Sequence, residues 1–129
     1  MTRAELRYLS STDVLDVTLD QYQPDDPEDV CITVDAYIGT EGGGGEDIFE
    51  FTVCTVTSLA ARVRNEGHLF AGNYLIVPRY DYGLVWQAIS SLCRETVGAT
   101  WQDVAVRLSY FGFWEFHGYD RGPSSDGAG

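Results

Sequence analysis

Hydrophobic and polar residues alternate in three segments of the first half of the chain, over residues 4–9, 30–38 and 48–56. A period of two is typical of β-strands that bury one face. In the first segment the apolar side comprises Ala4, Leu6 and Tyr8, and the polar side comprises Glu5 and Arg7. The glycine run at residues 42–45 separates the other two segments and predicts that they form a hairpin.

The register of this hairpin follows from the requirement that its apolar side chains share one face. That face pairs Ile32 with Val53, Val34 with Phe51 and Ala36 with Phe49. The other face then pairs Cys31 with Cys54, Thr33 with Thr52, Asp35 with Glu50 and Tyr37 with Ile48. Directly opposed like charges weaken a sheet. Asp35 and Glu50 are therefore either a solvated pair or a site that awaits a cation from a partner.

Helical spacing replaces the alternation in the second half of the chain. Three helices are expected, over residues 57–67, 81–98 and 100–112, and each ends at a glycine. Asp81 and Thr100 are the expected N-caps of the second and third helices. The apolar stripe of the second helix comprises Leu84, Val85, Ala88, Ile89 and Leu92, and the third buries Trp101, Val104, Ala105 and Leu108.

Two further segments complete the expected core. The apolar run at residues 73–78 predicts a central strand that is buried on both faces. Residues 111–120 hold five aromatic rings, most of which we assign to the core. Trp114 and Phe116 should close the core, and Tyr119 should remain outside.

The order of these elements predicts an α+β fold, a single domain with an antiparallel-rich sheet of about four strands packed by two to three helices. The domain is expected over residues 1–122, with a flexible carboxyl-terminal tail over residues 123–129.

The charge of the chain is concentrated at its amino-terminal end. Residues 1–50 contribute −11 of the formal net charge of −12, because thirteen acids stand against two arginines there. Such a field repels nucleic acids and anionic membranes and attracts basic proteins. No apolar run reaches the length of a signal peptide or a membrane span, so a soluble, cytoplasmic protein is expected.

The candidate partner-binding residues are acids of the loop after the first strand and polar residues of the hairpin. They are Asp13, Asp16, Asp20, Asp25, Asp26, Glu28, Asp29, Asp35, Tyr37 and Glu50. A surface kept acidic for solubility is the alternative interpretation. The uneven distribution of the charge favours a docking surface.

Catalytic and metal-binding patterns are weak. The sequence has no nucleophile elbow, zinc-protease motif or Walker loop, and the glycine run leads into a strand, so it lacks the helix that would bind a phosphate. His68 and His117 are expected to have structural or solvent roles, and the three cysteines are expected to be reduced thiols. We expect no metal, no cofactor and no enzymatic activity; Glu115 with His117 is the best catalytic alternative.

Five segments together resemble the immunity protein 8 family of bacterial polymorphic toxin systems. They are AELRYLSS, DQYQPDDPED, FEFTVCT, HLFAGNYLIVPRYDY and TWQDVAVRLSYFGFWEF, and the resemblance covers residues 4–119. It implies a non-catalytic protein that binds and neutralises a cognate toxin. A basic toxin, hypothetically a nuclease, would complement the acidic surface. A monomer or weak homodimer is expected. The alternative functions are a small acidic accessory subunit and an uncharacterised small enzyme that uses a carboxylate and a histidine.

Overall fold

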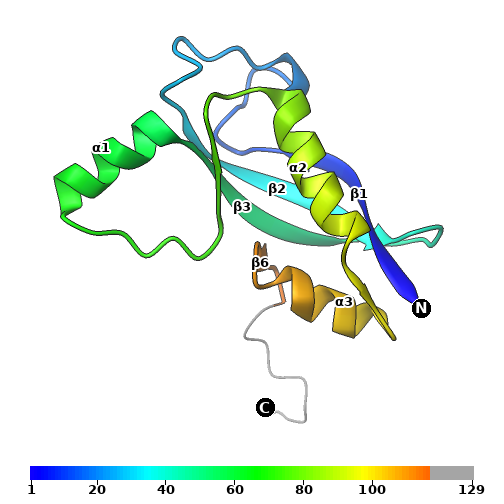
Figure 1. The fold of residues 1–129 in the computed structure, drawn as a ribbon. Coiled ribbons are helices and arrows are strands. Elements are labelled where there is room, and N and C mark those ends of the chain that lie inside the picture. The colour runs from blue at the N-terminus through cyan, green and yellow to red at the C-terminus, as the bar shows by residue number, and fades with distance from the viewer. Residues whose placement is uncertain (117–129) are drawn as a thin grey trace.

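The computed structural model of the protein describes residues 1–116 and has an α+β architecture, as predicted (Figure 1). The elements in chain order are β1 (Thr2–Ser10), the 3-10 helix η1 (Leu19–Gln21), β2 (Cys31–Thr40), β3 (Asp47–Thr55), α1 (Val56–Glu66), β4 (Tyr74–Val77), α2 (Tyr82–Arg94), β5 (Val97–Gly98), α3 (Trp101–Leu108) and β6 (Phe113–Trp114). Tyr119 and the predicted domain boundary at residue 122 lie outside the described residues.

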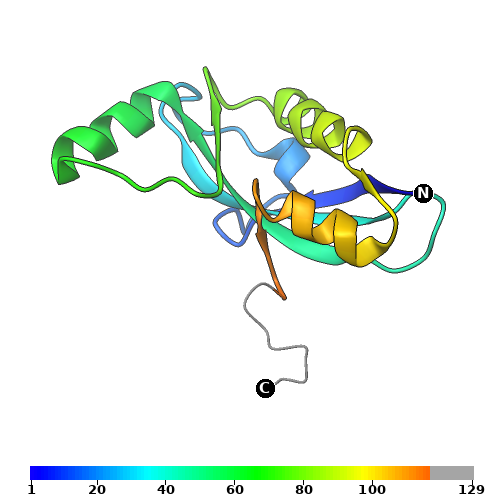
Figure 2. The ribbon, with the colours of Figure 1, turned by 60° about the horizontal axis from the view of Figure 1, so that its bottom comes forward.

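The strands form one mixed sheet in the order β4-β3-β2-β1-β5. β1, β2 and β3 are antiparallel, whereas β4 runs parallel to the second half of β3. β6 pairs with the first half of β3, so β4 and β6 share one edge of that strand. Helices α2 and α3 lie on the same face of the sheet (Figures 1 and 2). Their buried side chains form the core with the apolar face of β2 and β3.

The predicted hairpin register is confirmed at every pair. Ile32, Val34 and Ala36 pair with Val53, Phe51 and Phe49, and these six side chains are buried. The opposite face carries the pairs Cys31–Cys54, Thr33–Thr52, Asp35–Glu50 and Tyr37–Ile48. A single requirement, that apolar residues share the core face, therefore fixed the register of the whole hairpin.

The predicted sidedness of β1 is wrong after Leu6. The pairing with β2 shifts between Leu6 and Tyr8, which leaves Arg7 as the extra residue of a β-bulge. The bulge reverses the alternation, so Leu9 is buried and Tyr8 is 49% exposed.

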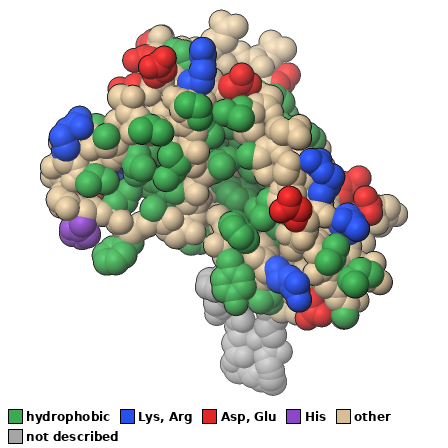
Figure 3. Space-filling view, viewed as in Figure 1, with side chains coloured by type: hydrophobic (Ala, Val, Ile, Leu, Met, Phe, Trp, Pro, Cys, Tyr) green, Lys and Arg blue, Asp and Glu red, His purple; other side chains and the backbone are tan. Residues whose placement is uncertain are grey.

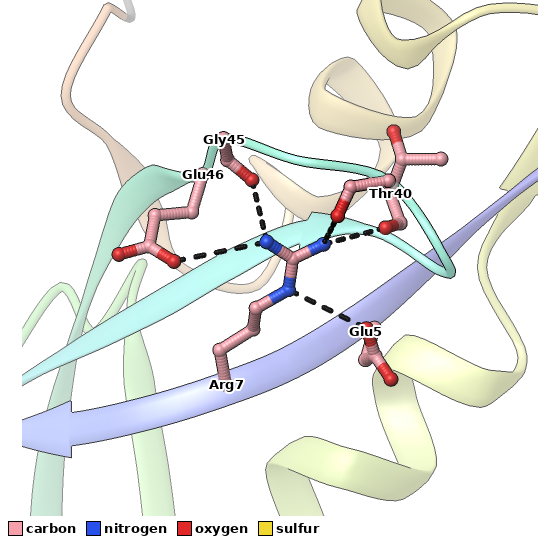
Figure 4. Close-up of polar contacts among 6 residues, drawn as sticks. Glu5, Arg7, Thr40, Gly45 and Glu46 are labelled. Atoms are coloured by element: carbon pink, nitrogen blue, oxygen red, sulfur yellow. Dashed lines mark hydrogen bonds and ion pairs between the residues drawn. The ribbon is translucent and has the colours of Figure 1, made fainter.

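Arg7 joins the bulge to the hairpin loop. Its guanidinium donates to the carbonyl oxygens of Thr40, Gly43 and Gly45 at 2.6, 2.8 and 2.8 Å (Figure 4). Glu5 and Glu46 lie 3.4 and 3.8 Å from the same group. A Cβ atom at Gly39 would lie 2.8 Å from Arg7 Cζ and 2.3 Å from the Gly45 oxygen. Glycine at position 39 therefore allows the strand and the loop to approach each other closely.

The apolar run at residues 73–78 forms β4, but the prediction of a central strand is wrong. β4 pairs with β3 alone and lies at the edge of the sheet, and Ile76 is 46% exposed. An edge strand has a neighbour on one side only, so a short apolar sequence there does not require burial on both faces.

Helices α2 and α3 begin directly after their predicted caps, and α1 begins at Val56, one residue before the predicted start. Asp81 Oδ1 accepts from Leu84 N at 3.2 Å, and Thr100 Oγ1 accepts from Asp103 N at 3.2 Å. The predicted ends of α2 and α3 are wrong, because α2 stops at Arg94 and α3 at Leu108. The glycine expected to end α2, Gly98, belongs to β5 and pairs with β1. In the predicted stripe of α2, Leu84 remains 38% exposed, while Cys93 is buried instead.

The aromatic segment divides between core and surface. Trp114 is buried and stacks on Phe49 with ring centroids 6.1 Å apart, and Phe116 packs edge-on against Trp114 at 5.9 Å. Phe111 and Phe113 are 53% and 50% exposed, so the prediction that most of these rings belong to the core is wrong for them. The two-residue strand β6 explains the difference between Phe113 and Trp114, because successive side chains of a strand point to opposite faces; Phe111 lies in the turn before it.

Asp47 anchors this segment to the sheet. Its Oδ2 atom accepts hydrogen bonds from Trp101 Nε1 of α3 at 2.9 Å and from Trp114 Nε1 of β6 at 3.1 Å. Phe49 lies between the same two indoles and packs edge-on against Trp101. One carboxylate at the start of β3 thus holds two elements from the end of the chain.

Candidate functional site

The sheet face turned away from α2 and α3 carries most of the polar strand residues, and we call it the open face. The hairpin contributes the half-buried side chains of Thr33, Asp35, Tyr37, Ile48, Glu50 and Thr52 to this face. Strand β1 contributes Tyr8 and Ser10. Figure 2 shows both helices on the other side of the sheet. The open face therefore exposes a polar strip that is bounded by the edges of β1 and β3.

Negative charge converges at Asp35. Asp35 lies opposite Glu50 in the register, and its pKa is raised above the ordinary value by burial and by the neighbouring charges of Asp13 and Glu115. Both effects disfavour the ionised carboxylate. An ionised Asp35 therefore destabilises the folded state.

Two of these acids are fixed by backbone donors. Beyond the end of β1, the Ser11 hydroxyl donates to the Thr33 carbonyl, and Thr33 N donates to Asp13 Oδ2 at 2.8 Å. Side chains thereby continue the β1–β2 pairing. On the opposite side, Ile48 N donates to Glu115 Oε2, and Glu115 N donates to the Ile48 carbonyl at 3.0 Å. Both carboxylates are thus held in place, and each can still accept further hydrogen bonds.

Glu115 was not among the predicted partner-binding residues. The signal that would have found it is the alternation of Trp114, Glu115 and Phe116. If the two rings face the core, an extended backbone directs Glu115 to the opposite face. In the sequence, Glu115 is a candidate only for catalysis with His117, which lies outside the described residues.

Two tyrosines lie beside the carboxylates. The rings of Tyr8 and Tyr37 have centroids 5.6 Å apart and are tilted by 56°. Tyr37 was a predicted contact residue, whereas Tyr8 reaches the open face only because of the bulge at Arg7. Tyrosine combines a large apolar ring with a polar tip, a combination that is frequent at protein interfaces.

The other acidic candidates lie between β1 and β2 in the chain and not on the paired strands. They are exposed residues of the long loop between β1 and β2, namely Asp16, Asp20, Asp25, Asp26, Glu28 and Asp29. Tyr80 ties the later part of this loop to the start of α2, since its hydroxyl donates to the Leu19 carbonyl at 2.9 Å and its backbone N–H donates to the Pro27 carbonyl. The acids that follow η1 form a second group, which we call the acidic loop: Asp25, Asp26, Glu28 and Asp29.

The structure gives few indications of catalytic or metal chemistry. His68 is exposed and contacts the ring of Phe70. Within residues 1–116, His, Cys, Asp and Glu do not gather in groups of three that would hold a metal ion. None of the helices described there has the length and apolar character needed to span a lipid bilayer.

Comparison with known proteins assigns the chain to a family. The family model described as immunity protein 8 matches residues 4–119. The chain belongs to the immunity protein 8 family. Neither the curated proteins nor the solved structures include a significant match to it. The matched range contains the open-face residues, the acidic loop and the aromatic segment, so all ten predicted contact residues belong to the family domain.

The chain also has an apolar cleft on its helix side. The cleft has a volume of about 390 Å³ and is lined mainly by Phe51, Leu75, Ile89, Leu92, Tyr110 and Phe111. In Figure 3, apolar side chains gather around a hollow at the centre of this face. Phe70 is 92% exposed, and Phe113, which is 50% exposed, pairs with Glu50 in the register and so adds apolar surface to the open face. The described part of the chain thus has carboxylates on the open face and an apolar cleft on the helix side.

Proposed function

We propose that the protein binds a cognate, positively charged toxin through the open face and neutralises it without catalysing a reaction. Membership of the immunity protein 8 family supports a toxin partner. The observation that carries the choice of surface is the setting of Asp35: burial and the charges of Asp13 and Glu115 raise its pKa, and Glu50 lies opposite it in the register. A lysine or arginine of the toxin would relieve this repulsion on binding.

The binding free energy would come mainly from complementary charges on the two proteins. Charge pairs across a protein interface couple by roughly 1.5 to 7 kcal/mol when they are close and desolvated. The carboxylates of Asp13 and Glu115 are already oriented by the backbone, so binding would not have to order them. Tyr8 and Tyr37 would supply apolar contact area next to the charges.

The acidic loop would have a different role in the same function. Exposed charges that are not in contact act mainly by raising the association rate, and salt screens them. A nuclease is the toxin class that we favour, because its own active site must attract phosphates and is therefore basic. The immunity protein would act in the cytoplasm of the cell that makes the toxin.

Binding kinetics would test the function and the surface separately. The toxin encoded by the adjacent gene, made inactive by substitution, would be measured against the wild type, Asp35→Asn/Glu50→Gln and Asp25→Asn/Asp26→Asn. We expect the open-face variant to weaken affinity by about 10²-fold, mainly through a faster dissociation rate. The acidic-loop variant should slow association by less than about tenfold and reduce its salt dependence.

The outcomes separate the two parts of the proposal. A toxin that binds equally well to the open-face variant would overturn the choice of surface. A candidate toxin that does not bind the wild-type protein, and is not neutralised by it when both are co-expressed, would overturn the proposed function for that pair.

The alternative of an acidic accessory subunit is favoured by the apolar cleft. Such a subunit would keep a large apolar interface in a stable assembly. We expect instead a monomer or a weak homodimer. Light scattering after size exclusion distinguishes the two, because an accessory subunit with a permanent interface would remain oligomeric on dilution.

A further inference from the structure

Cys31 and Cys54 lie directly opposite each other where β2 begins and β3 ends. Thr55 N donates to the Val30 carbonyl at 2.9 Å, so the ladder hydrogen bond joins the residues beside the cysteines. This pattern identifies Cys31 and Cys54 as a non-hydrogen-bonded pair. In such pairs the Cα atoms lie about 4.5 Å apart, within the range of roughly 4.4 to 6.8 Å that a disulfide bond allows. The backbone is therefore already placed for a bridge.

The two thiols differ in exposure. Cys54 is fully buried, whereas Cys31 is partly exposed. Burial and then a side-chain hydrogen bond with Cys54 raise the pKa of Cys31 to about 11, while the Arg62 guanidinium acts in the opposite direction. The third cysteine, Cys93, is buried among the core residues of α2. All three are free thiols.

We propose that Cys31 and Cys54 form a site of thiol–disulfide exchange that takes a low-molecular-weight disulfide as its substrate and closes a cross-strand disulfide bond. The Cys31 thiolate attacks one sulfur of the small disulfide, forming a mixed disulfide and releasing one small thiolate. The Cys54 thiolate then attacks the Cys31 sulfur and displaces the second small thiolate. The two protein thiols are oxidised, the small disulfide is reduced to two thiols, and the two protons pass to the released thiolates.

The order of the two steps follows from exposure. A small disulfide can reach Cys31 from solvent, but Cys54 has no exposed surface. The second step needs only the neighbour across the strand pair, so it should be fast once the first is complete. Because the pKa of Cys31 is raised to about 11, only a small fraction is thiolate at neutral pH, and the first step should accelerate as the pH rises.

The bridge would alter the molecule in a measurable way. It would join the two ends of the segment from Cys31 to Cys54, which contains the β2–β3 hairpin and its glycine loop. Closing a loop of this length in the unfolded chain should raise the Tm by roughly 10 °C. The inference does not depend on the proposed toxin-binding function.

Oxidised glutathione is a suitable probe for this site. The native wild-type protein would be incubated with it at several pH values, and the products quantified by intact mass and by mapping of the linked peptides. We expect a product that has lost two hydrogen atoms, carries no glutathione and links Cys31 to Cys54. Cys54→Ser should stop at the mixed disulfide on Cys31, and Cys31→Ser should remain unmodified. Cys93→Ser is the matched control and should behave as the wild type.

Each result decides for or against the proposal, and the wild-type measurement stands even if a variant folds poorly. A wild-type protein that accumulates a stable mixed disulfide, or that remains reduced in excess oxidised glutathione at alkaline pH, would overturn it. A bridge that includes Cys93 would also overturn it, because that product requires opening of the core.

Discussion

Replacement of Asp35 by asparagine should make the fold more stable at neutral pH. The amide has nearly the shape of the carboxylate but removes the charge that faces Glu50 and that Asp13 and Glu115 also repel. Directly opposed like charges on a sheet cost about 0.2 to 1 kcal/mol. Because Asp35 is only half-buried and solvent screens its neighbours, we expect a gain of about 0.5 to 1 kcal/mol, or roughly 3 °C in Tm.

The effect should depend on pH in a defined direction. The pKa of Asp35 is higher in the folded state than its ordinary value of 3.8. The folded state therefore binds this proton more tightly than the unfolded state, and wild-type stability falls as the pH rises through the folded-state pKa. The advantage of Asp35→Asn should be largest at neutral pH and should disappear below pH 3.8.

Urea denaturation at neutral pH and below pH 3.8 would measure this difference. Asp25→Asn is the control, because it removes an exposed charge of the acidic loop and should change stability by less than about 0.5 kcal/mol. If Asp35→Asn destabilised the protein at neutral pH, or if its effect were the same at both pH values, the like-charge account of the open face would be refuted. A gain would mean that the wild-type residue is retained at the expense of stability, as binding surfaces often are.

Three further substitutions test the structural supports of the site. Gly39→Ala should lower the free energy of unfolding by about 1 to 3 kcal/mol, because the added Cβ would press on the Gly45 oxygen and on Arg7. Gly44→Ala is the control: its Cβ meets nothing within 4 Å, so its thermal denaturation should match the wild type. Asp47→Ala should cost about 2 to 4 kcal/mol by leaving two indole N–H groups without their acceptor; Asp47→Asn should recover part of the loss, with tryptophan fluorescence as a second readout. Asp81→Ala should cost about 1 kcal/mol by removing the N-cap of α2, and an unchanged urea midpoint would contradict the capping role.

The parts of the fold that sequence predicted share a simple physical basis. The hairpin register follows from period two and one buried face, and the helix starts follow from side chains that accept backbone N–H groups. Both depend on neighbours in sequence or on a single pairing. The charge of the open face followed directly, because Asp35 and Glu50 must share a face once the register is set.

The errors arise where one residue or a distant element decides the outcome. The extra residue at Arg7 moves Tyr8 to the open face, and its contacts with the glycine loop are invisible in the local pattern. The apolar run of β4 is equally compatible with a central and an edge strand, and only the pairing partners decide. Glu115 reaches the open face because β6 pairs with β3, across more than sixty residues of sequence.

The edge of β3 that β4 and β6 share affects folding during synthesis. The strand is complete at Thr55, yet β4 covers its second half only after Val77 and β6 covers its first half only at Trp114. During synthesis from the amino terminus, the first half of this edge of β3 therefore remains unpaired until residue 114 has left the ribosome. A polypeptide that ends before Trp101 lacks Glu115 and both tryptophan donors to Asp47, and it presents a strand edge to which other chains can pair.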